Sequence, residues 1–142
     1  MKVNQAMTSD VKIISPDRTI REAAELMAEL DSGALPVGEN DRLVGMVTDR
    51  DIAIRGIGAG LKPTAKIREV MTPQVKYCFD DDEVDDVARN MGDVQVRRLP
   101  VVNRNKRLVG IISLGDVALM EGPGAAGPAI CGISEKTAAQ AA

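Results

Sequence analysis

Two stretches of the chain place apolar residues at the three- and four-residue spacing of an amphipathic helix. The apolar positions of the first stretch are Ile20, Ala23, Ala24, Met27 and Leu30. Those of the second stretch are Val84, Val87, Ala88, Met91 and Val94. A short run suited to a strand precedes each stretch, at 11–15 and at 75–79. The pattern therefore predicts a strand followed by a helix, twice, each with a short helical lead-in.

A β-hairpin is predicted after each of these helices. In the first half, apolar runs at 35–37 and 43–48 flank a turn-forming segment from Gly38 to Asp41, as in a hairpin. The second half repeats the arrangement with runs at 99–102 and 108–113. With a last short helix after each hairpin, both halves have the order βαββα, which predicts an α/β fold of the α+β kind.

The two halves are copies of one another. Segments 35–37 and 99–101 both read Leu-Pro-Val. Segments 45–51 and 110–116 share a second pattern: Gly, two apolar residues, a hydroxyl residue, two variable positions and Asp. The last helix of each copy is expected to begin inside this pattern, at about 49 and at about 114. An internal repeat of this length indicates one duplicated supersecondary unit.

The repeat sets the expected domain boundaries. Gly56, Gly58, Gly60 and Pro63 punctuate the crossing between the copies, as linker residues do. We therefore expect repeat 1 at 2–60, a linker at 61–65, repeat 2 at 66–120, and a flexible C-terminal tail at 121–142. The Gly- and Pro-rich residues 121–128 predict a break, and one weak helix is expected from Ala129 onward. Ile130 and Ile133 could pack against the rest of the domain or against a partner chain. We favour the alternative, disorder at the extreme C-terminal end.

The two long helices begin differently. Thr19 and Glu22 form a plausible capping box for the first, because each side chain can bind a free backbone N–H. The second begins after Asp80-Asp81-Asp82-Glu83. Carboxylates at a helix N-terminus are favoured by the helix dipole, so we interpret this cluster as capping. A cation site is the alternative.

Composition excludes several classes of function. The 142 residues carry a net charge of -3 with scattered basic residues, which argues against nucleic acid as a partner. No signal peptide and no run of 18 apolar residues is seen, so we expect a cytoplasmic protein without membrane contact. The chain has Cys78, Cys131 and no histidine, which removes zinc clusters, a disulfide framework and histidine-based catalysis. Cys78 is expected in the core, and Cys131 in the core or as a stray thiol.

The ordered, twofold occurrence of Leu-Pro-Val and Gly-x-x-[Ser/Thr]-x-x-Asp within βαββα units resembles the tandem CBS domain pair, or Bateman module. The resemblance spans about residues 2–120, and Val47 to Ile52 is similar to bacterial stand-alone members. It implies two repeats packed sheet to sheet with pseudo-twofold symmetry, clefts between them, and dimers formed through helices. The implied ligands are AMP, ADP or ATP, with S-adenosylmethionine or NAD in some members.

Carried onto this chain, the family motif places the hydroxyls of Thr48 and Ser113 where a strand ends and a helix begins. Free N–H groups and the helix dipole favour a phosphate there. Asp51 and Asp116, one turn further, would accept hydrogen bonds from ribose hydroxyls. The alternative is that these four residues are ordinary helix caps.

The resemblance also implies an apolar surface for the adenine. Its expected residues are Ile13, Ile14, Tyr77, Cys78, Ala34, Leu35, Pro36, Leu99 and Pro100. Basic residues differ between the copies: Arg50 becomes Gly115, and Gly33-Ala34 becomes Arg97-Arg98. Since guanidinium groups suit phosphate, we expect one cleft to be better equipped than the other. The alternative is that Arg50, Arg97 and Arg98 are solvated surface charges.

The sequence therefore favours a regulatory module that senses an adenine-type nucleotide and acts in trans on an unknown effector protein. It is expected to be a homodimer, to bind no metal and to need no cofactor. A ligand-free dimerisation or docking module is the alternative. An enzyme is disfavoured, because no spacing joins a base, a nucleophile and an oxyanion donor.

Overall fold

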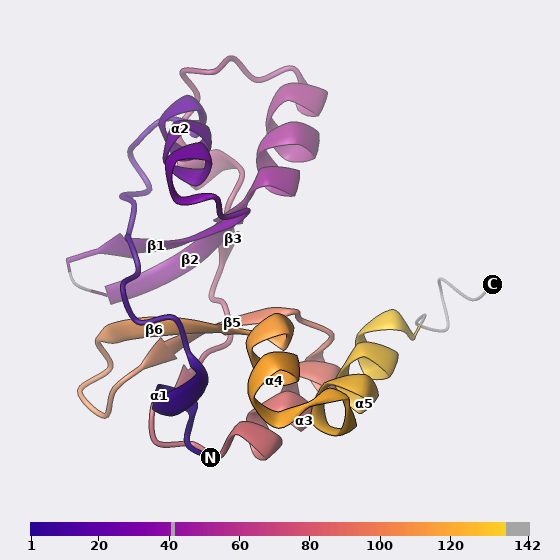
Figure 1. The fold of residues 1–142 in the computed structure, drawn as a ribbon. Coiled ribbons are helices and arrows are strands. Elements are labelled where there is room, and N and C mark those ends of the chain that lie inside the picture. Colours follow the sequence, from indigo (N-terminus) through magenta and orange to yellow (C-terminus); the bar gives the residue numbers. More distant parts are fainter. Residues whose placement is uncertain (41, 136–142) are drawn as a thin grey trace. The chain divides into compact units, whose positions relative to one another are not determined.

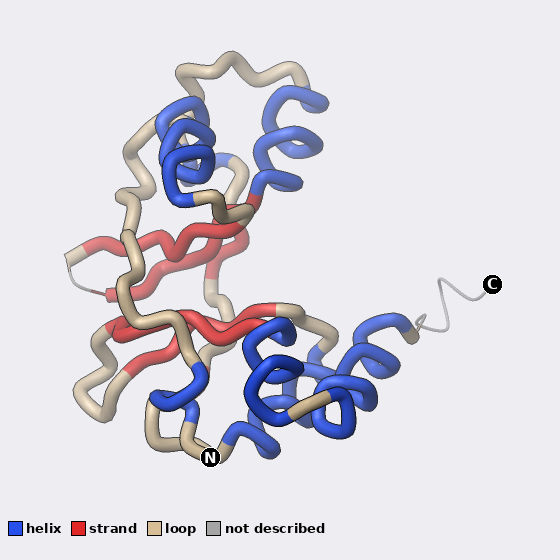
Figure 2. Tube along the Cα trace, in the orientation of Figure 1, coloured by secondary structure: helices blue, strands red, loops and turns tan. Residues whose placement is uncertain are grey.

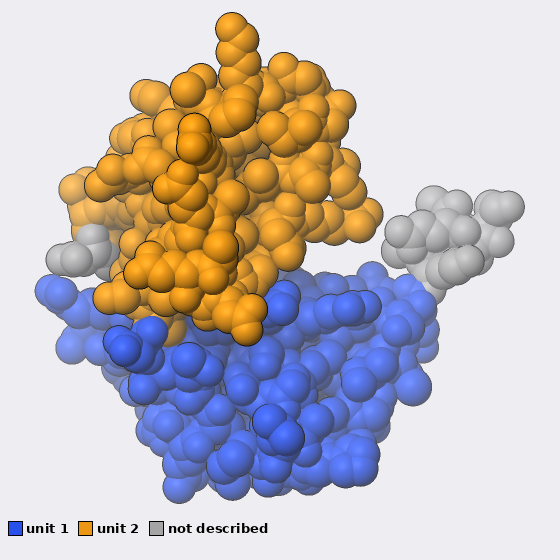
Figure 3. All heavy atoms as spheres, turned by 45° about the horizontal axis from the view of Figure 1, so that its top comes forward, with its two compact units in different colours: residues 1–10, 76–142 blue, residues 11–75 orange. Residues whose placement is uncertain are grey.

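The computed structural model describes residues 1–40 and 42–135, which form two compact units (Figure 3). Unit 2 is Val11–Val75, and unit 1 combines Met1–Asp10 with the chain from Lys76 onward. The lead-in of each repeat thus packs with the other repeat. Val3 is fully buried in the core of unit 1 and Ile67 in that of unit 2, so burial of these lead-in side chains accounts for the exchange.

Unit 2 is a three-stranded antiparallel sheet with helices on one face (Figures 1 and 2). The strands are β1 (Ala34–Glu39), β2 (Arg42–Thr48) and β3 (Thr72–Pro73). The helices are α2 (Ile20–Leu30), the π-helical η1 (Asp51–Gly56), and the short 3₁₀ turns η2 (Ile57–Ala59) and η3 (Ile67–Glu69). Ile20, Leu35, Val47, Ile67 and Val70 are central to its core.

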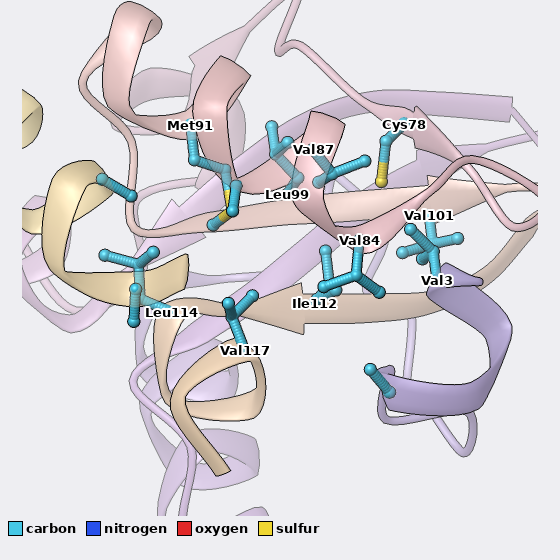
Figure 4. Packing of buried hydrophobic residues seen from close by; sticks show 14 residues of the cluster. Val3, Cys78, Val84, Val87, Met91, Leu99, Val101, Ile112, Leu114 and Val117 are labelled. Atoms are coloured by element: carbon cyan, nitrogen blue, oxygen red, sulfur yellow. The ribbon is translucent and has the colours of Figure 1, made fainter. Parts of the chain in front are cut away.

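Unit 1 has the same plan with one parallel strand pair. Its sheet has the order β4-β5-β6, with β4 (Cys78–Phe79) parallel to β5 (Arg98–Val102) and β6 (Leu108–Ser113) antiparallel to β5. Its helices are α1 (Val3–Ala6), α3 (Val84–Val94), α4 (Leu114–Glu121) and α5 (Pro123–Ser134). Figure 4 shows the core between sheet and helices, where Cys78, Val87, Leu99 and Val101 lie among its apolar side chains.

The α+β class, both long helices and both hairpins are confirmed. Asp41, in the first predicted turn, lies outside the described residues. Ala24 and Leu30 do not join the predicted apolar face, because both side chains are exposed.

The first predicted strand, 11–15, is wrong in extent. It contributes only a parallel bridge between Ile14 and Val37. Ile14 N–H donates to the Pro36 carbonyl, and the Ile14 carbonyl accepts from Gly38 N–H. Pro16 follows at once and has no N–H to continue the ladder, so pairing stops. In the second copy only Cys78 and Phe79 pair.

The predictions for the N-termini of the two long helices differ in how they compare with the structure. The capping box of Thr19 and Glu22 is confirmed, with Glu22 N–H donating to Thr19 Oγ1 at 3.1 Å. Glu83, in the acidic cluster, occupies the N-cap position of α3, but its side chain makes no cap hydrogen bond. Glu83 instead pairs with Lys2 Nζ at 2.9 Å and with the N-terminal ammonium. These contacts hold the lead-in segment on unit 1.

The tail is more ordered than the sequence predicts. A break was expected at 121–128, yet α5 begins at Pro123, because proline fits the first turn of a helix. Small residues then let α5 lie close to α3: a Cβ on Gly132 would be 2.8 Å from the Gly92 carbonyl oxygen. Ile133 packs against the core and Ile130 is exposed. The disorder expected for the extreme end concerns residues outside the described range.

The cysteines lie in opposite environments. Cys78 is buried, as predicted, and Cys131 is exposed on α5, which makes it a surface thiol. Residues 1–40 and 42–135 contain no cluster of three or more carboxylates or thiols able to hold a metal ion. No helix in this part of the chain is both long enough and apolar enough to span a bilayer.

Candidate functional site

The first candidate junction lies where β2 passes into the helix that follows it. Thr48 N–H donates to Asp51 Oδ2 at 3.0 Å, and Asp51 N–H donates to Thr48 Oγ1 at 3.0 Å. Each side chain thus binds the other's backbone, as in a capping box. Arg55 Nη1 also lies 3.7 Å from Asp51 Oδ1, so this carboxylate already has a cationic neighbour.

The second junction, from β6 into α4, has the same geometry. Ser113 N–H donates to Asp116 Oδ2 at 2.9 Å, and Asp116 N–H donates to Ser113 Oγ at 3.1 Å. The capping interpretation therefore describes both copies. It does not exhaust their chemistry, because a carboxylate has about four acceptor sites and a hydroxyl that accepts one bond still has a proton to donate.

Both junctions are attached to the preceding strand in the same way. Asp49 N–H donates to the Gly33 carbonyl, and Leu114 N–H donates to the Arg97 carbonyl, both at 3.0 Å. In the hairpin registers, Ala34 faces Thr48 and Arg98 faces Ser113. Directly opposed residues of an antiparallel pair share a face. The second copy therefore brings the Arg98 guanidinium and the Ser113 hydroxyl to one face.

The charge beside the two junctions differs. A Cβ on Gly33 would be 2.9 Å from Asp49 Oδ2, so the first copy holds a carboxylate over this glycine. The next residue, Arg50, is exposed and its N–H donates to Asp49 Oδ1. In the second copy Leu114 replaces Asp49 and is buried, while Arg97 and Arg98 are exposed. Cationic side chains therefore dominate only at the second junction.

The residues expected around the adenine divide between two faces. The side chains of Ile14, Leu35, Cys78 and Leu99 belong to the two cores. Because successive side chains of a strand point to opposite faces, these four present only their backbone to the outer face.

The remaining expected residues lie on the outer faces. Alternation turns Ala34, Pro36 and Pro100 away from the core clusters, although all three are buried. Ile13 and Tyr77 are exposed. In unit 1 the outer face thus joins Tyr77 and Pro100 with the residues of the second junction.

Sequence reasoning missed the ring that contacts Tyr77 and the arginine that contacts that ring. The Tyr77 and Phe79 rings make an edge-to-face contact with centroids 5.8 Å apart. The guanidinium carbon of Arg104 lies 4.1 Å from the centre of the Phe79 ring. The available signal was that the only tyrosine and the only phenylalanine of the chain stand two residues apart, where a strand places both side chains on one face.

The fold and the duplicated junctions define a tandem module. Comparison of the chain with known protein families identifies the family to which this module belongs. The CBS domain family matches residues 3–56 and 67–120. The chain belongs to this family and contains two CBS domains in tandem, which confirms the resemblance seen in the motifs.

Curated relatives support this assignment. The CBS domain-containing protein YhcV of Bacillus subtilis is 40% identical over 135 residues, covering 94% of this chain and 96% of YhcV. Hypoxic response protein 1 of Mycobacterium tuberculosis is 41% identical over 114 residues, covering 79% of each chain. Inosine-5'-monophosphate dehydrogenase of Methanocaldococcus jannaschii is 37% identical, but the match covers only 23% of that enzyme.

Solved structures of the same fold include ligand complexes. Hypoxic Response Protein I with two coordinated zinc ions has a TM-score of 0.76 and 38% identity, covering 84% of this chain and 98% of that one. CBSX2 in complex with AMP has a TM-score of 0.74 and 28% identity, covering 84% and 95%. The CBS domain pair of MJ0100 with 5-methylthioadenosine and S-adenosyl-L-methionine has a TM-score of 0.75 and 28% identity, covering 87% and 98%.

Proposed function

We propose that the protein is a non-catalytic regulatory module that binds an adenine-type nucleotide. The observation that carries the proposal is the pair of matched junctions, in which Thr48 with Asp51 and Ser113 with Asp116 adopt one geometry and retain hydrogen-bonding capacity. Adenosine-containing ligands in CBSX2 and MJ0100 support it. The hydroxyl would donate to phosphate and the carboxylate would accept from ribose.

The second junction is the better phosphate site in this proposal. Arg98 shares a strand face with Ser113, and Arg97 precedes it. At the first junction the Asp49 carboxylate accepts from the Arg50 backbone N–H, which places a negative charge where the second copy has Leu114. Guanidinium groups bind phosphate through paired, charge-assisted hydrogen bonds, so the copy with two arginines and no Asp49 equivalent favours the anion.

Regulation would pass to a partner through self-association. Ile54 and Leu119 occupy the same position in the two repeats, three residues after Asp51 and Asp116. Their exposed fractions are 52% and 87%, and large apolar side chains exposed at matched positions are suited to an interface. We propose a homodimer that acts in trans on an effector protein. A ligand would regulate it only by preferring one arrangement over another.

Calorimetric titration with AMP tests the assignment of the carboxylates. Asp116→Asn keeps an oxygen that can accept the Ser113 N–H bond, so the helix cap survives while the negative charge is lost. We expect AMP affinity to fall about tenfold, in line with a lost charge-assisted bond, and the melting temperature to change little. Asp51→Asn is the matched variant in the first copy and is expected to have the smaller effect. Unchanged affinity in Asp116→Asn would remove Asp116 from the site.

Incubation of the wild-type protein with adenine nucleotides also distinguishes this proposal from a docking module and from an enzyme. A module that only docks or dimerises would show no stabilisation with any adenine nucleotide, since a ligand of the native state must raise its stability. An enzyme would hydrolyse the nucleotide during incubation, and a single carboxylate substitution would abolish that hydrolysis.

A further inference from the structure

The aromatic residues of unit 1 form a short column with an arginine at one end. Tyr77 and Phe79 meet edge to face, with ring planes at 83°. Arg104, in the β5–β6 hairpin, lies over the Phe79 ring at 4.1 Å. Cation–π and edge-to-face contacts both have preferred geometries, so the arginine restricts the Phe79 ring and the Phe79 ring restricts Tyr77.

Arg104 is itself fixed from the other side. Its Nε and Nη2 atoms donate to Asp81 Oδ2 and Oδ1 at 3.0 and 2.7 Å. A single ion pair on the surface contributes little to stability, but a bidentate pair constrains the guanidinium plane. The hydrogen bond and charge of Arg104 also lower the pKa of Asp81 below its ordinary value, so the pair persists across the neutral pH range.

The column ends at a ring that is open to solvent. Tyr77 is 41% exposed, whereas its neighbour Cys78 is buried in the core. Tyr77 therefore belongs to the outer face of the sheet, together with Pro100 and the Arg98–Ser113 pair. A flat aromatic surface held in place beside an anion site is suited to stacking of a nucleobase.

Unit 2 also has a carboxylate–arginine pair without rings, although its arginine, Arg68, comes from the lead-in of repeat 2 and not from the repeat position of Arg104. Asp17 stands at the repeat position of Asp81 and accepts from Arg68 Nη2 at 3.0 Å. The positions of Tyr77 and Phe79 are taken by Ile13 and Ser15. Of these two pairs, only the one in unit 1 therefore couples its arginine to an aromatic ring.

We propose that Arg104 and Phe79 are positioning residues that hold the Tyr77 ring as the stacking surface for the nucleobase of the ligand. This inference rests on the proposed nucleotide binding and assigns the base to the second copy. Arg104 does not touch the ligand in this account and acts through the two rings. The first copy, with Ile13 in place of the ring, offers the base only an aliphatic contact.

Tyrosine fluorescence tests the proposal directly, because the chain has one tyrosine and no tryptophan. AMP is titrated into the full-length protein, with emission followed alongside calorimetry, and N-acetyltyrosinamide corrects for absorption by the nucleotide. Ribose 5-phosphate, which has no base, is the ligand control. Arg104→Ala is compared with Arg68→Ala, which removes the arginine that pairs with Asp17 in unit 2. Phe79→Leu provides a second variant that keeps an apolar side chain.

We expect AMP, and not ribose 5-phosphate, to quench Tyr77 in the wild-type protein. Arg104→Ala and Phe79→Leu should bind AMP about three- to tenfold more weakly, as the loss of one ring contact implies, with less quenching at saturation. Arg68→Ala should match the wild type. Calorimetric binding without quenching, or equal behaviour of Arg104→Ala and Arg68→Ala, would overturn this inference and leave the proposed function standing. Absence of AMP binding by calorimetry would overturn both.

Discussion

At the residue scale, the two thiols show how burial decides chemistry. Burial, and then the charge of Asp82, raises the pKa of Cys78 from 9.0 to about 12. The thiolate is the reactive form, so Cys78 stays protonated and inert at neutral pH. Cys131 is exposed on α5. Because the folded pKa of Cys78 exceeds the unfolded value, its contribution to stability is present below about pH 9 and is lost as the pH rises toward 12.

Thiol titration with an aromatic disulfide reagent at pH 8 checks this difference. We expect one fast-reacting thiol per native chain and two in denaturant, because unfolding exposes Cys78. Cys131→Ser should leave no fast-reacting thiol. Two fast thiols in the native wild-type protein would contradict the burial of Cys78.

Thr19 provides a second test at this scale. Thr19→Ala removes the hydroxyl that accepts from Glu22 N–H, and we expect a loss of about 1 kcal/mol in the free energy of unfolding. Urea denaturation measures it, with the exposed Thr64→Ala as the control. Equal stability of the two variants would show that the capping box contributes nothing.

At the scale of elements, the sequence predicts best those helices and hairpins whose formation depends on local spacing and turn residues. The helices around Ile20 and Val84 and both hairpins follow from spacing and turn residues. The strand at 11–15 does not, because Pro16 removes a donor and limits pairing to Ile14. The helix expected from Ala129 onward is part of α5, but residues 123–128 of α5 were missed. Their glycines and prolines lower helix propensity, whereas the close contact of α5 with α3 is visible only in the folded chain.

Alanine substitutions at two glycines of α5 distinguish the effect of helix propensity on stability from the effect of packing against α3. Gly132→Ala places a Cβ 2.8 Å from the Gly92 carbonyl oxygen, whereas Gly124→Ala meets nothing within 4 Å. We expect Gly132→Ala to destabilise the protein by about 1–3 kcal/mol through overpacking. Gly124→Ala should stabilise it slightly through helix propensity. Thermal unfolding measures both, and stabilisation by Gly132→Ala would contradict close packing of α5 on α3.

At the scale of the whole molecule, the sequence reveals the duplication but not the exchange of the lead-in segments between the repeats. Matching repeats along the sequence assigns each lead-in to the repeat that follows it, yet Val3 and Ile67 are buried with the other repeat. The candidate site was partly predictable for a related reason. The matching motif identifies Thr48, Asp51, Ser113 and Asp116, but strand alternation in the fold decides which apolar side chains leave the core.

A thermal shift titration with adenine ligands tests the central claim most directly. AMP, ADP, ATP and S-adenosylmethionine are each added to the purified protein up to millimolar concentration, with ribose 5-phosphate and GMP as controls. The account predicts a saturable rise in melting temperature with at least one adenine ligand, equivalent to about 2.7 kcal/mol when the ligand reaches 100 times its dissociation constant. The controls should produce a smaller rise. A melting temperature that no adenine ligand changes would contradict nucleotide binding and favour a module that only docks or dimerises.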